Sequence, residues 1–88
     1  MGYKIEWSAT AAKQFDGLDN GIKQQIAKTL QKLEERDDPR TFGKPLQSNL
    51  VGLWRYRIGN IRLIAEIQDD KMIVLVLTLN KRDVIYKH

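Results

Sequence analysis

The sequence of 88 residues contains no cysteine, so it can form neither a disulfide nor a metal site with thiolate ligands. Its longest largely apolar run, residues 72–79, is less than half of the ~20 residues that a membrane-spanning helix needs. The N-terminal residues MGYKIEWS lack the long apolar core of a signal peptide. We therefore expect one soluble domain over residues 1–88, located in a reducing cytoplasm and with no membrane partner.

Positive charge is unevenly distributed along the chain. Residues 1–43 hold seven basic and seven acidic side chains, whereas residues 44–88 hold eight basic and four acidic ones. The formal net charge of +4 therefore arises entirely from the second half. Such asymmetry indicates a basic face on a neutral scaffold, and the usual partner of such a face is a polyanion or an acidic protein.

The first half of the chain predicts a strand and two helices. Residues 3–7 alternate between apolar and polar side chains, as in a strand that is buried on one side. Ser8 is a suitable N-cap for a first helix, which ends near Gly17. A second helix begins near Asn20 and ends before Pro39, which breaks the hydrogen-bond ladder. The apolar positions recur at helical spacing: Ala9, Ala12 and Phe15 in the first helix, then Ile22, Ile26, Leu30 and Leu33 in the second.

The second half predicts three strands after a loop over residues 40–52. These strands are expected at residues 53–58, 61–67 and 72–79, with turns at Gly59-Asn60 and Asp69-Asp70. The third run is apolar almost throughout, which favours a central strand covered on both faces. The predicted fold class is α+β: an N-terminal strand, a two-helix hairpin and an antiparallel three-stranded meander, with the helices packed on one face of a small sheet.

Three arginines gather on one face of the predicted hairpin. A two-residue turn at Gly59-Asn60 sets Arg57 directly opposite Arg62, and Arg55 shares their face because side chains alternate along a strand. Like charges that face each other destabilise a sheet. A solvent-exposed sheet face needs polar residues, and arginine is an ordinary choice there. A bound phosphate would instead turn the repulsion into attraction, because it accepts paired hydrogen bonds from guanidinium groups.

The C-terminal residues NKRDVIYKH add Lys81, Arg82 and Tyr86. If the polyanion is RNA, attack of a 2′-OH on the adjacent phosphate needs positive charge around the phosphorane, a base and an acid. The arginines can supply the charge, but they stay protonated and are poor bases. Tyr86 is a candidate acid or base, Lys81 is a second one, and the Tyr86 ring could instead stack on an unpaired base. His88 is a weaker candidate, and no metal site is evident.

The segments GLWRYRIGNIRLIAEI (residues 52–67) and LNKRDVIY (79–86) resemble the RelE/ParE toxin superfamily. The most specific elements are the R-x-R-x-G-x-x-R hairpin and the closing K-R-x-x-x-Y, and K-P-L at residues 44–46 is a softer match. The resemblance covers nearly the whole chain, and within the superfamily it favours the RelE type.

This resemblance implies a bacterial or archaeal type II toxin that acts as a metal-independent endoribonuclease, enters the ribosomal A site and cuts mRNA without a cofactor. It implies a cognate RelB-like antitoxin as partner, and contact with operator DNA only through the toxin–antitoxin complex. By matched position, Arg55 and Arg57 line the active site, Arg62 and Arg82 hold the scissile phosphate, and Tyr86 acts in acid–base chemistry or stacking. Lys44 and Lys81 are assigned to RNA binding.

Two departures and two alternatives accompany the resemblance. Well-known RelE-type members often have lysines at the positions of Arg55 and Arg57, so a lysine-like base is not expected there. The chain stops two residues after Tyr86, so a C-terminal helix like that of relatives is not expected. The alternatives are a ParE-type gyrase poison and a non-catalytic RNA- or protein-binding module of the same fold. The full basic-plus-tyrosine set favours the nuclease.

Overall fold

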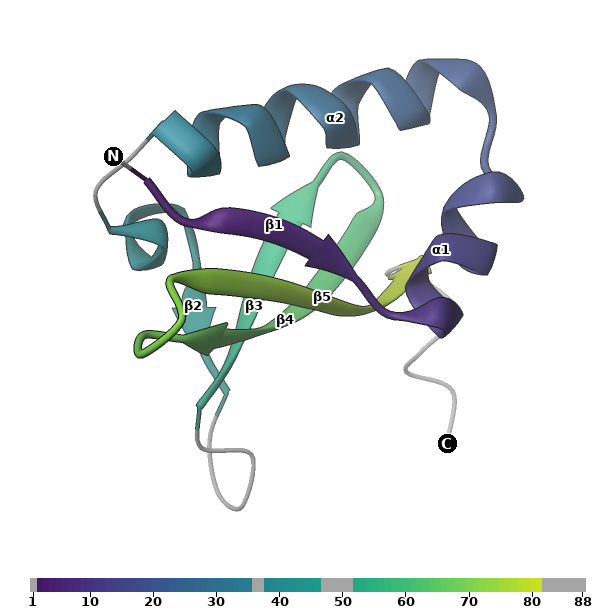
Figure 1. Cartoon of the computed structure of the whole chain (residues 1–88). Coiled ribbons are helices and arrows are strands. Elements are labelled where there is room, and N and C mark those ends of the chain that lie inside the picture. The colour runs from purple at the N-terminus through teal and green to yellow at the C-terminus, as the bar shows by residue number, and fades with distance from the viewer. Residues whose placement is uncertain (1, 36–37, 47–51, 82–88) are drawn as a thin grey trace.

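Five strands form one mixed sheet in the order β1-β5-β4-β3-β2 (Figure 1). The computed structural model describes residues 2–35, 38–46 and 52–81. The strands are β1 (Lys4–Trp7), β2 (Lys44–Pro45), β3 (Leu53–Ile58), β4 (Ile61–Gln68) and β5 (Ile73–Lys81); the helices are α1 (Ala9–Asp16), α2 (Asn20–Glu35) and the short 3-10 helix η1 (Pro39–Phe42). Strands β3, β4 and β5 form the predicted antiparallel meander, and β1 pairs parallel with β5. The predicted α+β class is confirmed, while η1 and β2 lie in what the sequence predicts as a loop.

Both α1 and α2 lie over the same face of the sheet (Figure 1). The prediction for α2 is confirmed, since Ile26, Leu30 and Leu33 are buried against the strands. The predicted stripe of α1 is wrong in part: Phe15 packs against the core as predicted, but the buried residue is Ala11, whereas Ala9 and Ala12 are exposed. The difference arises because the side of α1 that faces β5 includes a polar residue, Gln14, which has backbone partners there. Among the described residues, no helix is both long and apolar enough to cross a membrane.

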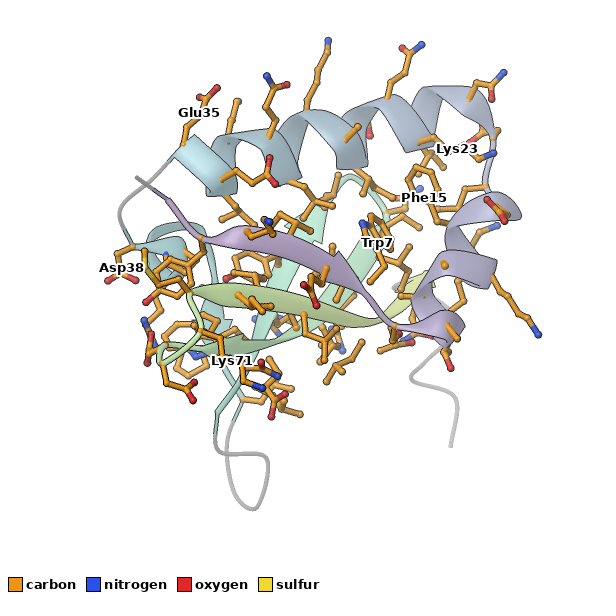
Figure 2. All side chains as sticks on the ribbon, in the orientation of Figure 1. Trp7, Phe15, Lys23, Glu35, Asp38 and Lys71 are labelled. Atoms are coloured by element: carbon orange, nitrogen blue, oxygen red, sulfur yellow. The ribbon has the colours of Figure 1, made fainter. Side chains whose placement is uncertain are left out.

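An aromatic contact joins the first strand to both helices. The rings of Trp7 in β1 and Phe15 in α1 meet edge to face, with 5.1 Å between their centroids (Figure 2). The ammonium group of Lys23 in α2 lies 5.7 Å from the centroid of the Phe15 ring. The helical hairpin is thereby held against the edge of the sheet that β1 forms.

Strand β5 is central, as predicted, but only one of its faces is covered in the described part of the chain. Val74 and Val76 face the helices and are fully buried, whereas Ile73 and Leu75 lie on the opposite, open face and are half-buried. The predicted cover on the second face is not found among the described residues. Side chains of the neighbouring strands partly shield Ile73 and Leu75 on the open face. An apolar run in a strand therefore does not require a second layer of helices.

A β-bulge shifts the face alternation in β5. Ile64 pairs with Thr78 but the next residue, Ala65, pairs with Val76, which leaves Leu77 without an opposite residue. Before the bulge the even-numbered residues are buried, and after it Leu79 is buried instead. The bulge thus keeps Leu79 in the core and places Thr78 on the side of Ile64, at the edge of β5, where α1 reaches its hydroxyl.

Helix α1 provides hydrogen-bond partners for backbone groups of β5 at and beyond the bulge. The Ser8 hydroxyl donates to the Leu77 carbonyl at 2.8 Å, and its oxygen accepts from the Ala11 N–H at 3.0 Å as the N-cap. The Gln14 side-chain oxygen accepts from the Leu79 N–H at 2.6 Å and from the Thr78 hydroxyl at 3.1 Å. The bulge is therefore held in place by the start and the middle of one short helix.

Gln14→Leu is expected to lower the free energy of unfolding by about 1–3 kcal/mol, because it removes the hydrogen-bond acceptor of the Leu79 N–H. Urea denaturation measures this change. The matched control is Gln24→Leu, the same change at an exposed position of α2, where a shift within about 0.5 kcal/mol is expected. Equal losses in the two variants would contradict the role given to Gln14.

Candidate functional site

The open face of the sheet carries four basic side chains from three adjacent strands. Arg57 pairs directly with Arg62 and Arg55 pairs with Ile64, as the sequence predicts. Lys44 of β2 pairs with Arg55, so it lies on the same face. Tyr56 and Ile58, which alternate with the arginines, are buried under the helices. We call Lys44, Arg55, Arg57 and Arg62 the basic face.

The turn at Gly59-Asn60 fixes this register. Gly59 adopts φ +58°, whereas Asn60 does not have a positive φ. A glycine with positive φ at the first central position is typical of a type II′ turn, whose twist matches that of the two strands. Because the turn contains two residues, Ile58 pairs with Ile61 and both are buried. A slip by one residue would expose one of them, so the same packing that buries the isoleucines sets the arginines opposite each other.

Arg57 and Arg62 form the closer kind of cross-strand pair. The Leu53 carbonyl accepts a hydrogen bond from the Leu46 N–H, so the backbone groups of residues 53, 55 and 57 point toward β2 and away from β4. The pair of Arg57 and Arg62 is therefore not bridged by backbone hydrogen bonds, and such pairs place their Cα atoms about 4.5 Å apart rather than about 5.5 Å. Their repulsion acts at the shorter of the two spacings.

Among the described residues, acidic groups near Lys44, Arg55 and Arg57 are few. No ion pair among the described residues involves Lys44, Arg55 or Arg57. Glu66 lies on the same face of β4, but four residues along the strand from Arg62, and its carboxylate accepts from the Gln68 amide at 2.8 Å. Asn80 of β5, the residue opposite Arg62, is neutral. The face therefore presents a positive potential to an incoming anion.

Lys81, another predicted site residue, is not part of this group. Lys81 pairs with Ile61, so strand alternation directs it to the helix-covered side, opposite to the arginines, where it is exposed at the end of β5. Arg82, Tyr86 and His88 lie outside the described residues. In the described parts of the chain, no cluster of three or more histidine, cysteine, aspartate or glutamate residues could hold a metal ion.

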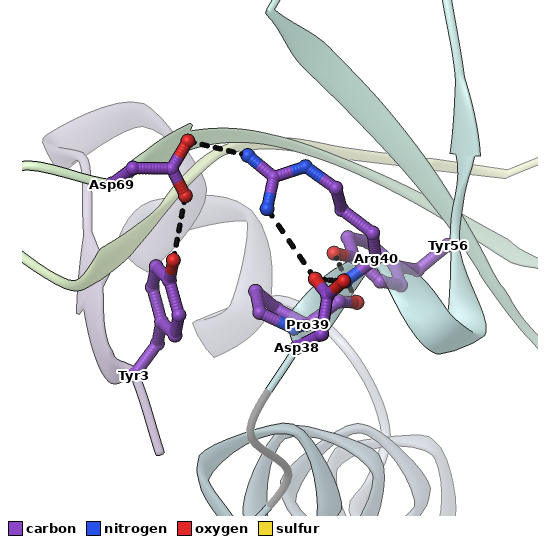
Figure 3. Close-up of polar contacts among 6 residues, drawn as sticks. All are labelled: Tyr3, Asp38, Pro39, Arg40, Tyr56 and Asp69. Carbon is purple, nitrogen blue, oxygen red and sulfur yellow. Dashed lines mark hydrogen bonds and ion pairs between the residues drawn. The ribbon is translucent and has the colours of Figure 1, made fainter. Parts of the chain in front are cut away.

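A polar cluster that the sequence did not predict ties the start of β1 to η1 and to the β4–β5 turn (Figure 3). The Arg40 guanidinium contacts Asp69 at 2.7 Å and Asp38 at 3.3 Å, and the Tyr3 hydroxyl donates to Asp69 at 2.6 Å. The hydrogen bonds from Tyr3 and Arg40 lower the pKa of the Asp69 carboxyl, and the bond to Asp69 raises the pKa of Tyr3. Arg40 also lies over the Trp54 ring, 5.6 Å from its centroid.

Tyr56 holds η1 and the start of β2 against β3. Its buried hydroxyl donates to the Pro39 carbonyl at 2.9 Å, and burial raises its pKa to about 12. A Cβ atom at Gly43 would lie only 2.9 Å from the Tyr56 ring, so the chain passes too close to the ring to carry a side chain there. This contact and the Arg40 cluster fix the short strand that carries Lys44, and so they position Lys44 beside Arg55.

Comparisons with known proteins agree with this architecture. A family model described as the ParE toxin of the type II toxin–antitoxin system parDE matches residues 5–86. Toxin RelG of Mycobacterium tuberculosis is 29% identical over 87 residues, which cover 99% of each chain. The crystal structure of the RelBE2 toxin–antitoxin complex from M. tuberculosis matches with a TM-score of 0.82 at 26% identity, covering 93% of both chains. A free-state structure of an Escherichia coli RelE variant shares the fold, with a TM-score of 0.79, 22% identity, and coverage of 97% of this chain and 88% of that one.

Arg57→Thr is expected to raise the free energy of unfolding by roughly 0.2–1 kcal/mol in low salt, because it removes one partner of a facing like-charge pair. The gain measured by urea denaturation should shrink in 1 M salt, where the screening length is about 3 Å. Arg57→Lys keeps the charge and serves as control. A gain that does not depend on salt would point to strand propensity and not to charge.

Asp69→Asn is expected to remove part of the acid sensitivity of folding. The pKa of Asp69 is lowered in the folded state, so its contribution is present above the unfolded value of about 4 and is lost as the pH falls through the folded pKa. Thermal denaturation between pH 2 and pH 7 measures the effect. Asp70→Asn, the adjacent carboxylate in the same turn, is the control, and curves of the same shape for both variants would contradict the prediction.

Proposed function

The chain belongs to the family of ParE toxins of type II toxin–antitoxin systems, and from that premise we propose that it is a ribosome-dependent endoribonuclease. The family match bears out the RelE/ParE resemblance of its arginine hairpin. The proposed reaction is cleavage of mRNA in the ribosomal A site, by attack of a ribose 2′-OH on the adjacent phosphodiester. The observation that carries the proposal is the direct pairing of Arg57 with Arg62 on an open face that also presents Arg55.

The proposed chemistry assigns positive charge to the strands and proton transfer to the C-terminal segment. Arg57 and Arg62 would hold the scissile phosphate between them, and their fixed charges would stabilise the extra negative charge of the phosphorane. Arg55 and Lys44 would bind the RNA chain next to it. Guanidinium groups remain protonated, so they cannot easily take the proton of the 2′-OH. We assign that step, or protonation of the leaving 5′-oxygen, to Tyr86, with Arg82 as a further phosphate ligand.

The geometry also explains why arginine suits these positions. A guanidinium is planar and can donate two parallel hydrogen bonds to one phosphate, whereas an ammonium binds as a point charge. Two guanidiniums directly opposite each other can therefore engage separate oxygens of one phosphodiester. No metal ion or cofactor is needed for this scheme, because the side chains supply the positive charge. The assignment of Lys81 to RNA binding fits this scheme poorly, since its strand position directs it to the other side of the sheet.

A cognate antitoxin is the second proposed partner. The similar M. tuberculosis structure is a toxin–antitoxin complex. We propose that this chain is likewise neutralised by a RelB-like antitoxin, and that it reaches operator DNA only through that complex. A nuclease that needs the ribosome would act in the cytoplasm of a bacterium or an archaeon. The net charge of +4 suits an acidic antitoxin as well as RNA.

A second candidate function is poisoning of DNA gyrase. The family model that matches is described by the ParE toxin, and the same fold serves both activities. The basic face favours RNA, because three arginines on one open sheet face match a phosphodiester more directly than a protein surface. A non-catalytic module that uses this face only for docking is the third outcome that the experiment below distinguishes.

In a reconstituted translation system, the wild-type protein is expected to produce mRNA breaks within codons at the A site, mapped by primer extension. Arg57→Ala is expected to reduce the rate of cleavage about 10²-fold or more, because it removes one phosphorane-stabilising group. Tyr86→Phe is expected to slow cleavage while leaving ribosome binding intact.

Lys71→Ala, at an exposed residue of the β4–β5 turn, is the control and should cleave at the wild-type rate (Figure 2). Circular dichroism checks that each variant is folded. Inhibition with intact mRNA and accumulation of gyrase–DNA cleavage complexes would support the gyrase alternative. Ribosome binding with neither effect would leave only the docking module.

A further inference from the structure

A small hollow opens beside the basic face, between α2 and the edge of β3. It has a volume of about 210 Å³ and is lined by Thr29 and Lys32 of α2 and by Tyr56 and Arg57 of β3. The hydroxyl of Tyr56 is already bonded to Pro39, so the polar groups available to a ligand are those of Thr29, Lys32 and Arg57. Two of these three residues are cations and neither is in an ion pair with another described residue.

The hollow exists because β2 is short. Strand β2 pairs with Trp54 and Arg55, and beyond them no strand of the described residues covers the edge of β3. The backbone groups of Arg57 point to this edge, as the alternation from Leu53 requires. An uncovered strand edge offers N–H donors as well as side chains. Arg57 therefore borders both the basic face and the hollow.

Packing of α2 fixes the other wall. Ile26, Leu30 and Leu33 point into the core, which turns Gln25, Thr29 and Lys32 toward the β3–β4 hairpin. A Cβ atom at Gly59 would lie 3.0 Å from the Gln25 side-chain oxygen, so the helix and the hairpin turn are in close contact. Figure 1 shows the tip of this hairpin directly beneath α2. The positions of Thr29 and Lys32 are thus set by the core and not by a loop.

The charge of this wall favours an anion. Lys28 and Lys32 are one helical turn apart, a spacing at which like charges repel. Glu35, three residues beyond Lys32, is the nearest acidic residue along this side of α2, and it forms no ion pair with another described residue.

The size of the hollow is compatible with a phosphate group. At ~30 Å³ for each water, 210 Å³ holds about seven water molecules. Pockets for drug-sized ligands are larger, about 300–1,000 Å³. The hollow therefore has room for a phosphate group with some of its water.

We propose that Thr29, Lys32 and Arg57 form a second phosphate subsite, which binds an RNA phosphodiester other than the one held on the basic face. This inference rests on the proposed ribonuclease function for the identity of its ligand. RNA that lies on the basic face at Arg57 can continue around the β3 edge onto α2, so Lys32 contributes to binding and not to bond cleavage. The phosphate belongs either to the mRNA strand or to ribosomal RNA, and the two sources differ in the assay that detects them.

The first assay measures the binding of a single-stranded oligoribonucleotide whose 2′-hydroxyls are methylated, so that it cannot be cut. Fluorescence anisotropy is recorded between 0.05 and 0.3 M salt. Lys32→Gln is expected to weaken binding roughly three- to ten-fold at 0.1 M salt, and to reduce the slope of log affinity against log salt by about 0.7, the value of one lost phosphate contact on a single strand. Lys32→Arg should restore both values, and Thr29→Val should weaken binding without changing the slope.

The matched control is Lys13→Gln, because Lys13 lies in the last turn of α1 as Lys32 does in α2, and so carries the same helix-end effect. A second assay measures co-sedimentation with ribosomes. Loss of ribosome binding with unchanged oligonucleotide binding would assign the phosphate to ribosomal RNA. Equal behaviour of Lys32→Gln and Lys13→Gln in both assays would overturn the subsite.

The two proposals fail differently. If the wild-type protein cuts no mRNA, but the Lys32→Gln variant binds RNA more weakly than the wild type does, the nuclease proposal fails and the subsite stands. The opposite result is that both variants cleave mRNA, that Lys32→Gln and Lys13→Gln need the same ribosome concentration for half-maximal cleavage, and that they bind the oligonucleotide equally. In that case the subsite fails and the nuclease proposal stands.

Discussion

The register of the β3–β4 hairpin is the constraint on which the rest of this structure depends. Burial of Ile58 opposite Ile61 leaves only one pairing that keeps the apolar side chains under the helices. That pairing puts Arg57 against Arg62 at the closer cross-strand spacing. The free energy gained by burying the isoleucines exceeds the repulsion between two exposed or half-exposed guanidiniums, at ~1.5–3 kcal/mol for each apolar side chain against ~0.2–1 kcal/mol for the pair. The core thus holds the charges where a ligand can use them.

The supports of the basic face come from side chains other than its own four cations. The Arg40 cluster joins the first strand and the β4–β5 turn to η1, and Tyr56 joins η1 to β3. Together they fix the two residues of β2, which would otherwise be too short to hold Lys44 in place. These contacts lie on the helix-covered side and at its rim, so none of them occupies the open face that is proposed to bind RNA. The proposed subsite at Lys32 extends the same surface around the sheet edge.

Local sequence signals predicted the elements and the arginine pair, because each was encoded by neighbouring residues. Strand alternation, helical spacing in α2 and the Gly59-Asn60 turn all act over a few positions. The features that sequence reasoning missed depend on partners far apart in the chain. Arg40 meets Asp69 and Tyr3 only after folding, and nothing near Arg40 signals that contact. The stripe of α1 was misplaced because Gln14 binds the backbone of β5, and a lone glutamine gives no such signal. Lys32 looks like any solvent-exposed helix lysine until α2 is packed beside the β3 edge.

The bulge at Leu77 has a consequence for building hybrids between this chain and its relatives. Upstream of Leu77 the buried positions of β5 are even-numbered, and downstream the buried position, Leu79, is odd-numbered. The alternation of buried and open-face residues is therefore shifted by one residue at the bulge. If a segment that spans this point were taken from a relative whose strand has no bulge, its alternation would not match. Its apolar side chains would then lie on the open face and its polar side chains in the core. The crossover point in a hybrid therefore has to be chosen by the position of the bulge and not by sequence alignment alone. A shift of one residue there moves every following side chain of the strand to the opposite face of the sheet.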